Sequence, residues 1–215
     1  MMKVGLFGGT FDPIHNGHLR MAERVLDAFG LDRIWFIPAR IPPHKEAAGV
    51  SDPWHRYAMV ALATEGHPDL VPSALELRSE ETSYTINTIN RVRQRLGDEV
   101  ALYFLMGTDS WGEIETWKDY RELLVRCSVI LLPRQGSEDL DGSGVPVIEV
   151  HDRAPENASA GGPAVFILRT GEVTVSSTSI RERAARGESL AGLVPDGVER
   201  YLQKQGLYEA VGAGL

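Results

Sequence analysis

Short apolar runs that alternate with longer amphipathic segments are the feature that most constrains the fold of this 215-residue chain. The runs have the length of β-strands, and the segments between them repeat apolar residues at helical spacing. Strands are predicted at residues 3–7, 33–38, 100–106, 128–132 and 164–168, and helices at 17–29, from about 51, and at 84–96, 177–186 and 196–205. Because strands joined through helices form a parallel sheet, we expect an α/β fold with a doubly wound, Rossmann-like parallel sheet.

Local signals indicate where several helices begin or end. Gly30 is placed to end the first helix. Ser51 is the expected N-cap of the second, with Pro53 in its first turn, and Ser83 or Thr82 that of the third. Weaker signals predict short extended pieces at 69–73 and 74–77 and a short helix at 120–125.

The segment 134–163 differs in composition from the rest of the chain, because Gly, Ser, Pro and acidic residues surround one short apolar piece at 147–150. We interpret it as surface excursions around an edge strand. The sequence has no internal repeat and no clear interdomain linker. We therefore expect a single domain at 1–215, in which residues 173–208 form a small C-terminal helical part.

Composition excludes several classes of protein. The 22 Lys and Arg residues against 30 Asp and Glu give a net charge of −8, which disfavours nucleic acid and anionic membranes as partners. No apolar run approaches the roughly 20 residues of a membrane span, and the N-terminus has no signal-peptide core. The single cysteine, Cys127, is interpreted as a buried strand residue without a role. These features lead us to expect a cytoplasmic protein.

The first strand ends in GGTFDPIHNGHL, residues 8–19, where the chemistry is concentrated. Gly8 and Gly9 let a ligand approach the backbone at the carboxyl end of the strand, where open α/β sheets bind ligands. His15 and His18 lie three residues apart at a helix start, so both imidazoles can stand beside its unpaired N–H groups. This predicts a phosphate site, although a tight turn with two solvated histidines has the same pattern. A zinc site is weaker still, because no third ligand stands nearby.

A second group of polar residues lies far along the chain, in VTVSSTSIRER. Ser176, Ser177 and Thr178 fall where a helix begins, so that hydroxyl and backbone N–H groups converge. Arg181 follows one turn later and suits a phosphate. Taken alone, the group is equally consistent with an ordinary helix cap and a surface arginine.

The sequence GGTFDPIHNGH resembles the mark of the nucleotidyltransferase superfamily, (His/Thr)-x-Gly-His, and in that superfamily a Ser-Ser-Thr-x-Ile-Arg string accompanies it. The resemblance implies that catalysis depends on His15, His18, Lys45 and Arg181. It implies that ATP is bound by Gly8, Gly9, Thr10, Phe11, His15, His18, Ser176, Ser177, Thr178 and Arg181.

Three further stretches are similar to one member family, the bacterial nicotinate-nucleotide adenylyltransferases: PARIPPHK, ETSYTINTI and FLMGTDSWGEIETWKDY. The resemblance implies that nicotinate mononucleotide is bound by His44, Lys45, Tyr84, Thr85, Gly107, Asp109, Trp117 and Lys118. In the family, the pyridine ring stacks on the residue that matches Trp117, and backbone N–H groups at the positions of Thr85 and Lys118 hold its carboxylate. Many members have tyrosine where this chain has Lys118. Without the resemblance, Trp111 and Trp117 would be interpreted as core residues, and Asp109 is also a candidate helix N-cap.

The family implies that the 5′-phosphate of nicotinate mononucleotide attacks the α-phosphorus of ATP and releases pyrophosphate. No carboxylate pair is suited to a metal, so Mg²⁺ is expected to arrive bound to ATP. Four alternatives stay open: another transferase such as phosphopantetheine adenylyltransferase or a cytidylyltransferase, use of nicotinamide mononucleotide, a non-catalytic nucleotide sensor, and, remotely, a class I aminoacyl-tRNA synthetase. The sequence also leaves the oligomeric state open, including a homo-oligomer.

Overall fold

A parallel β-sheet forms the centre of the computed structural model, which describes residues 1–41, 49–79, 81–133, 144–155, 162–169 and 175–209. Within them, seven strands lie in the order β3-β2-β1-β4-β5-β7-β6, and each neighbouring pair is parallel. The strands are β1 (Lys3–Gly9), β2 (Arg33–Pro38), β3 (Leu70–Pro72), β4 (Ala101–Gly107), β5 (Ser128–Leu132), β6 (Val147–Val150) and β7 (Val165–Leu168). The expected doubly wound parallel sheet is confirmed.

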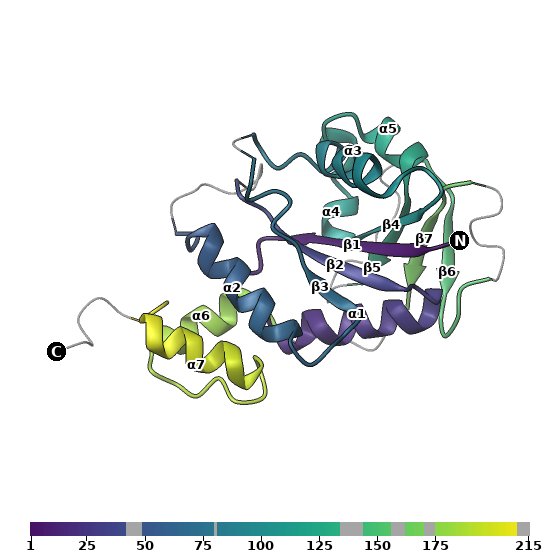
Figure 1. Cartoon of the computed structure of the whole chain (residues 1–215). Coiled ribbons are helices and arrows are strands. Elements are labelled where there is room, and N and C mark those ends of the chain that lie inside the picture. Colours follow the sequence, from purple (N-terminus) through teal and green to yellow (C-terminus); the bar gives the residue numbers. More distant parts are fainter. Residues whose placement is uncertain (42–48, 80, 134–143, 156–161, 170–174, 210–215) are drawn as a thin grey trace.

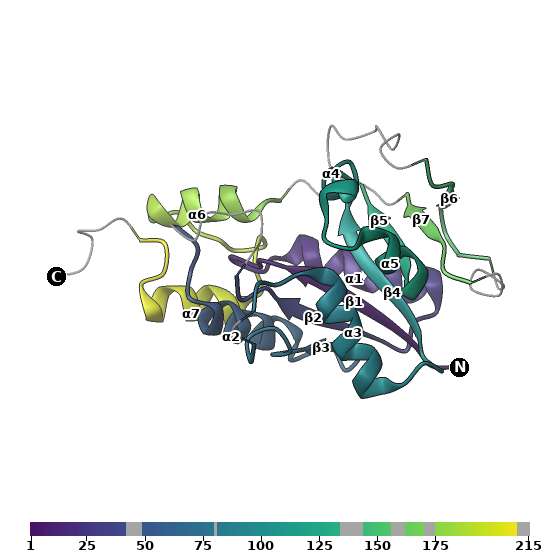
Figure 2. The same ribbon diagram turned by 90° about the horizontal axis from the view of Figure 1, so that it is seen from above.

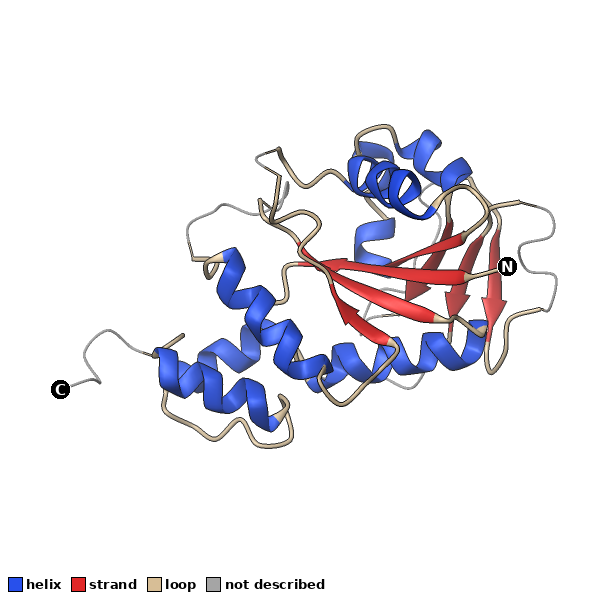
Figure 3. Ribbon diagram, in the orientation of Figure 1, coloured by secondary structure: helices blue, strands red, loops and turns tan. Residues whose placement is uncertain are grey.

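Helices cover both faces of this sheet (Figures 1 and 3). They are α1 (Asn16–Phe29), α2 (Pro53–Thr64), α3 (Thr85–Leu96), α4 (Thr108–Trp111), α5 (Tyr120–Arg126), α6 (Ser177–Ala185) and α7 (Asp196–Gln205), with a 3₁₀ turn at Ile114–Thr116. Helix α1 lies on one face, and α3 and α5 lie on the other. Helix α7 lies next to α2, and α6 and α7 both lie beyond the carboxyl ends of the strands (Figures 1 and 2).

Burial on both faces explains why the strands are almost wholly apolar. Strand residues on one face, including Phe7 and Ile130, pack with α1, α2 and the C-terminal helices. Residues on the other face, including Leu6 and Val129, pack with α3, α5 and the fully buried Trp111. Alternate residues of each strand thus enter two separate cores, as the pleat requires.

Several predicted boundaries are confirmed and a few are wrong. Gly30 ends α1 in the left-handed conformation, with φ 58° and ψ 47°. Asp52, not Ser51, caps α2 by accepting a hydrogen bond from the Trp54 N–H at 2.8 Å. Neither Ser83 nor Thr82 caps α3, which begins after Tyr84 without a side-chain cap.

Two other predictions about local structure also need correction. Residues 75–78 form a turn rather than an extended piece, and its backbone is closed by the Arg78 N–H bonded to the Ala74 carbonyl and the Ser79 N–H bonded to the Glu76 carbonyl. Cys127 is buried, as expected, but it ends α5 just before β5 begins. Burial raises the pKa of the Cys127 thiol to about 12, so it stays protonated near neutral pH.

Helix α7 packs against α2, and α6 is hydrogen-bonded to the turn between β1 and α1. The single domain at 1–215 stays a prediction. Of its expected C-terminal helical part, residues 173–208, the structure describes residues 175–208. The piece at 147–150 is the expected edge strand, β6, whereas residues 134–143 and 156–161 lie outside the described residues. Among the described residues, no helix is long and apolar enough to cross a membrane.

Strand order fixes where a ligand can bind. From β1 the chain continues to β2 and β3 on one side of the sheet, whereas β4 lies on the other side of β1. The direction of winding therefore reverses between β1 and β4. In open α/β sheets, the crevice at the carboxyl ends of such a strand pair is the usual ligand site.

The sheet order predicts different costs for two isoleucine truncations. Ile130 lies in the interior strand β5 and is fully buried, whereas Ile148 lies in the edge strand β6 with 41% of its surface exposed. We expect Ile130→Ala to lower the free energy of unfolding by about 2–5 kcal/mol and Ile148→Ala by less than about 1 kcal/mol. Urea unfolding of both variants measures the difference. Equal losses would contradict the edge position of β6.

Candidate functional site

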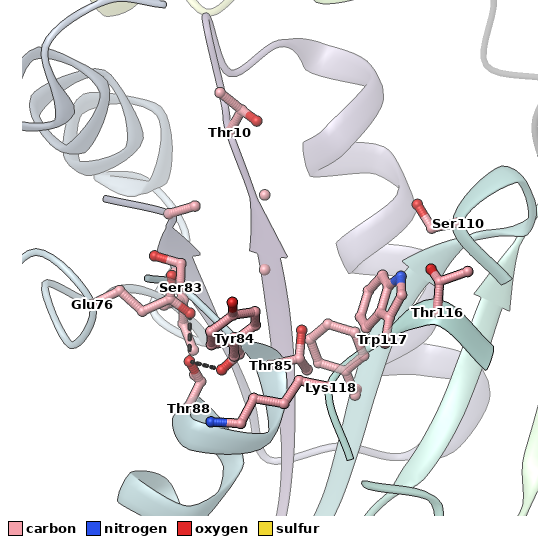
Figure 4. A pocket seen from close by; sticks show the side chains of 15 residues that line it. Thr10, Glu76, Ser83, Tyr84, Thr85, Thr88, Ser110, Thr116, Trp117 and Lys118 are labelled. Carbon is pink, nitrogen blue, oxygen red and sulfur yellow. Dashed lines mark hydrogen bonds between the residues drawn. The ribbon is translucent and has the colours of Figure 1, made fainter. Parts of the chain in front are cut away.

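A pocket opens at the carboxyl ends of β1 and β4, the place that the strand order indicates (Figure 4). Its volume is about 260 Å³, the scale of a site for a small molecule rather than for a macromolecule. The lining residues come from β1, β2, β4 and the segments after β1 and β2, from the turn at 75–78, from the start of α3 and the residues before it, and from α4 and the segment after it: Gly8, Gly9, Thr10, Ile37, Ala39, Glu76, Ser83, Tyr84, Thr85, Thr88, Phe104, Ser110, Thr116, Trp117 and Lys118.

Gly9 is needed where β1 enters this pocket. A Cβ atom at this position would lie 2.9 Å from Cζ of Phe11 and 3.1 Å from two further ring atoms. Phe11 is 3% exposed and cannot move aside easily. Its φ of 50° is in the left-handed region, which non-glycine residues rarely adopt, and this turns the chain sharply after β1. The backbone at Gly8 and Gly9 is thereby left open to a ligand.

Aromatic and cationic side chains form the opposite wall of the pocket. Trp117 is half-buried and packs edge-on against Phe104, with ring centroids 6.2 Å apart. The Lys118 ammonium lies 5.0 Å from the centroid of the Tyr84 ring. Thr85 is the first residue of α3, so the N–H groups of the first helical turn lie at the wall of the pocket. This wall offers a ring face, a positive charge and N–H donors to one ligand.

The two histidines of the first helix are brought together, as predicted. Their rings are stacked with centroids 3.7 Å apart and planes inclined by 26°. The backbone N–H of His15 donates to Nδ1 of His18 at 3.2 Å. A neutral His18 ring therefore carries its proton on Nε2 and can act there as a hydrogen-bond donor.

Residues more than 160 positions away hold the turn between β1 and α1. The Ser177 hydroxyl donates to the Pro13 carbonyl at 2.9 Å, and Nη1 of Arg181 donates to the Asp12 carbonyl at 2.7 Å. Ser176 caps α6 by accepting from the Ser179 N–H at 3.1 Å. These bonds bring the two polar stretches together, whereas their binding of ATP stays a prediction. The Thr178 hydroxyl oxygen lies 3.5 Å from Nη2 of Arg181, next to this contact.

A buried arginine braces the carboxyl ends of β1 and β2. The guanidinium of Arg56, 1% exposed, donates three hydrogen bonds: from Nη1 to the Thr10 carbonyl at 2.7 Å, from Nη2 to Ala39 at 2.7 Å and from Nε to Ser51 at 2.9 Å. Burial lowers the pKa of Arg56, and the nearby Asp12 carboxylate opposes that shift. Each carboxylate oxygen of Asp12 accepts a hydrogen bond from another residue.

The Asp12 side chain explains how the C-terminal segment reaches the same turn. Oδ1 accepts from the Tyr208 hydroxyl at 2.5 Å and Oδ2 from the Ser51 N–H at 3.2 Å. Burial, followed by the charge of Asp12, raises the pKa of the Tyr208 hydroxyl, which therefore remains a donor. Among the described residues, no three His, Cys, Asp or Glu side chains group as they would around a metal.

Not every predicted site residue reaches the pocket. Gly107 ends β4, and the exposed Asp109 lies in the first turn of α4; neither belongs to the pocket lining. Asp109 is not the N-cap either, because Gly107 holds that position. His44 and Lys45 lie outside the described residues. Trp111 is fully buried in the core, whereas Trp117 lines the pocket.

Sequence reasoning missed the charged residues that hold the site together. Arg56 falls on the buried face of α2 with Met59, Val60 and Ala63, a helical spacing that marks an inward-pointing charge. Glu76 stands between two leucines in an apolar piece, which is a similar signal. A charge on a predicted core face indicates a buried hydrogen-bond network.

Comparison with known proteins gives concordant matches. The cytidylyltransferase-like family model matches residues 6–183. Proteins named probable nicotinate-nucleotide adenylyltransferase are 39% identical in Thermoanaerobacter sp. (strain X514), over 97% of this chain and 95% of theirs, and 39% identical in Syntrophotalea carbinolica, over 97% and 98%. The Plasmodium falciparum nicotinic acid mononucleotide adenylyltransferase complexed with NaAD has a similar fold, with a TM-score of 0.73 and 17% identity over 97% of this chain and 98% of that one.

The bonds of Arg56 predict a large cost for its removal. Arg56→Met leaves three part-buried carbonyl groups without their donors and removes a buried charge from its partners, and we expect the free energy of unfolding to fall by about 2–5 kcal/mol. Arg24→Met is the matched control, because Arg24 is exposed on α1 and its loss should change stability by less than about 0.5 kcal/mol. Urea unfolding compares the two. A similar small loss in both variants would show that Arg56 does not brace the strands.

Proposed function

This chain belongs to the nicotinate-nucleotide adenylyltransferases, within the cytidylyltransferase-like family, and on that premise we propose how its pocket and turn perform adenylyl transfer. The enzyme transfers the adenylyl group of ATP to nicotinate mononucleotide and forms nicotinate adenine dinucleotide and pyrophosphate, a step of NAD biosynthesis. The observation that carries the proposal is the juxtaposition of the aromatic pocket with the His15–His18 turn across Gly8 and Gly9.

The pocket suits the pyridine mononucleotide. The indole face of Trp117 matches a cationic pyridinium ring, and the N–H groups at the start of α3 match a carboxylate. Lys118 adds a positive charge on the same wall. We assign the carboxylate to the backbone N–H groups of Thr85 and Lys118. We assign Asp109 to the ribose hydroxyls of the mononucleotide, Gly107 to contact with the same ligand, and His44 and Lys45 to the phosphates.

The turn between β1 and α1 suits the phosphates of ATP. Gly8, Gly9, Thr10 and Phe11 bring the backbone close, and His15 and His18 stand at the start of α1. Ser176, Ser177, Thr178 and Arg181 approach from α6 and complete the proposed ATP site.

In the reaction, an oxygen of the mononucleotide 5′-phosphate attacks the α-phosphorus of ATP. A new P–O bond forms as the bond between the α-phosphorus and the bridging oxygen breaks, and pyrophosphate leaves with that electron pair. The nucleophile is already an anion, so no general base is required. The protein aligns two mutually repelling phosphates and stabilises the charge that develops, with His15, His18, Lys45 and Arg181 as donors.

The residues fit a metal that arrives with the nucleotide rather than one held in a protein cage. Asp12, the buried carboxylate of the turn, already accepts hydrogen bonds on both oxygens, and no carboxylate cluster occurs among the described residues. Mg²⁺ bound to ATP would neutralise charge on the phosphates. The cytoplasmic location and the oligomeric state stay predictions.

Pyrophosphate release with ATP and Mg²⁺ tests the proposed function. Nicotinate mononucleotide, nicotinamide mononucleotide and phosphopantetheine are offered in parallel as acceptors. We expect strong preference for nicotinate mononucleotide, because N–H donors and a lysine favour a carboxylate over a neutral amide. Release with another acceptor would redirect the assignment to that substrate, and binding of ATP without release would favour a nucleotide sensor.

Replacement of His18 tests the phosphate site. His18→Ala removes a donor to the developing charge, and we expect kcat to fall by roughly 10²–10³. His67→Ala is the control, because His67 lies on the surface beside Glu23 and should leave kcat within about twofold. Steady-state assays at saturating substrates compare the two. A His18→Ala enzyme with full turnover would remove His18 from the mechanism.

A further inference from the structure

Glu76 is a buried carboxyl group in the wall of the pocket that adenylyl transfer, as described above, does not use. It is 7% exposed and lies in the turn at 75–78, between β3 and α3. Its Oε1 accepts a hydrogen bond from the Thr88 hydroxyl at 2.5 Å, a contact visible in Figure 4. Thr88 is one helical turn beyond Thr85, so this bond ties the start of α3 to Glu76.

The Ser83 hydroxyl lines the same wall of the pocket as Glu76 and acts to lower the pKa of the Glu76 carboxyl. Ser83 Oγ accepts hydrogen bonds from the backbone N–H groups of Arg40 at 3.1 Å and Ile41 at 3.4 Å. With its oxygen used in this way, Ser83 keeps its hydroxyl proton for an acceptor in the same wall, and the Glu76 carboxyl is the acidic group there. This is also why Ser83 does not cap α3, although its residue type and position favour a cap.

Glu76 therefore stands between two walls of the pocket. One is the start of α3, reached through Thr88, and the other is the segment that leaves β2, reached through Ser83. Nη1 of Arg40 closes the same arrangement by donating to the Ser79 carbonyl at 2.9 Å. Because a buried polar network is most rigid when every member is bonded, the loss of its central acceptor should loosen both walls together.

We propose that Glu76 is a positioning residue that holds the start of α3 against the segment after β2, and so sets the affinity of the pocket for the pyridine mononucleotide. The inference rests on the proposed function, since it assigns that ligand to this pocket. Glu76 acts through Ser83 and Thr88, and the groups it orients are the N–H donors at the start of α3.

The protonation of Glu76 is compatible with an anionic ligand nearby. Burial raises the pKa of its carboxyl, an effect that outweighs the opposing hydrogen bonds of Thr88 and Ser83 and the charges of Arg91 and Arg56. The uncharged form thus persists to higher pH than for an exposed glutamate. Protonation of Glu76 therefore reduces its repulsion of the carboxylate of nicotinate mononucleotide at higher pH than protonation of an exposed glutamate would.

Calorimetric titration of nicotinate mononucleotide into Glu76→Ala and Glu76→Gln tests the inference. We expect Kd to rise about tenfold in Glu76→Ala, where both hydroxyls lose their acceptor, and less than about threefold in Glu76→Gln, which keeps the shape and an acceptor oxygen. The KM for ATP should stay within about twofold in both. Thr64→Val is the control: it removes another buried hydroxyl, bonded to the Val60 carbonyl at 3.0 Å, and should leave Kd unchanged.

A double-mutant cycle separates positioning from stability. If Glu76 acts through Thr88, then Thr88→Val should weaken binding in the wild-type background but by less than about twofold in Glu76→Ala. Should Glu76→Ala fail to fold, Ser83→Ala and Thr88→Val test the two links singly, each with Kd raised about threefold or more. Unchanged Kd in the folded variants, or fully additive effects, would overturn the inference while wild-type activity upheld the proposed function. An inactive wild type with nicotinate mononucleotide would overturn the function itself.

Discussion

In a parallel sheet, the carboxyl ends of all the strands lie on the same side. The backbone groups that follow these strand ends need hydrogen-bond partners from outside the sheet. In this protein, the carbonyl groups just after the carboxyl end of β1 accept hydrogen bonds from side chains of remote elements. Arg56 reaches Thr10, Ser177 reaches Pro13, and Arg181 reaches Asp12. The rest of the site depends on these bonds, because they fix the path of the chain from β1 into α1 and hence the place of both histidines.

The same requirement shapes the other side of the pocket. The backbone N–H groups of Arg40 and Ile41, just after β2, donate hydrogen bonds to the Ser83 hydroxyl oxygen. The Thr88 hydroxyl donates to Glu76, beside Ser83 in the same wall. Each half of the site is thus organised by one buried charged or ionisable side chain, Arg56 beside the turn and Glu76 beneath the pocket. Both are shielded from water and hydrogen-bonded to neighbouring segments, which makes them sources of rigidity rather than of chemistry.

How far the sequence predicted this arrangement depends on the range of the interaction involved. Apolar periodicity located the strands, and the Gly-Gly and His-x-x-His spacing located the phosphate turn, since these signals are local. The caps at Ser51 and Ser83 were predicted wrongly for different reasons. Helix α2 begins at Pro53, so Asp52 rather than Ser51 occupies the N-cap position. The Ser83 hydroxyl instead accepts a hydrogen bond from the segment after β2, so that a tertiary bond replaces the local one there.

The sequence alone determined the class of fold, the location of the two glycines at the carboxyl end of a strand, and the family resemblance that indicates the reaction. Each of these depends on residue type at fixed spacing. Only the tertiary structure decided that Trp111 is core while Trp117 faces the pocket, and that Arg56, Glu76 and Tyr208 hold the site. The physical reason is that these roles come from contacts between residues that lie from 12 to 196 positions apart in the chain. Nothing in the local pattern specifies which buried polar groups will find each other.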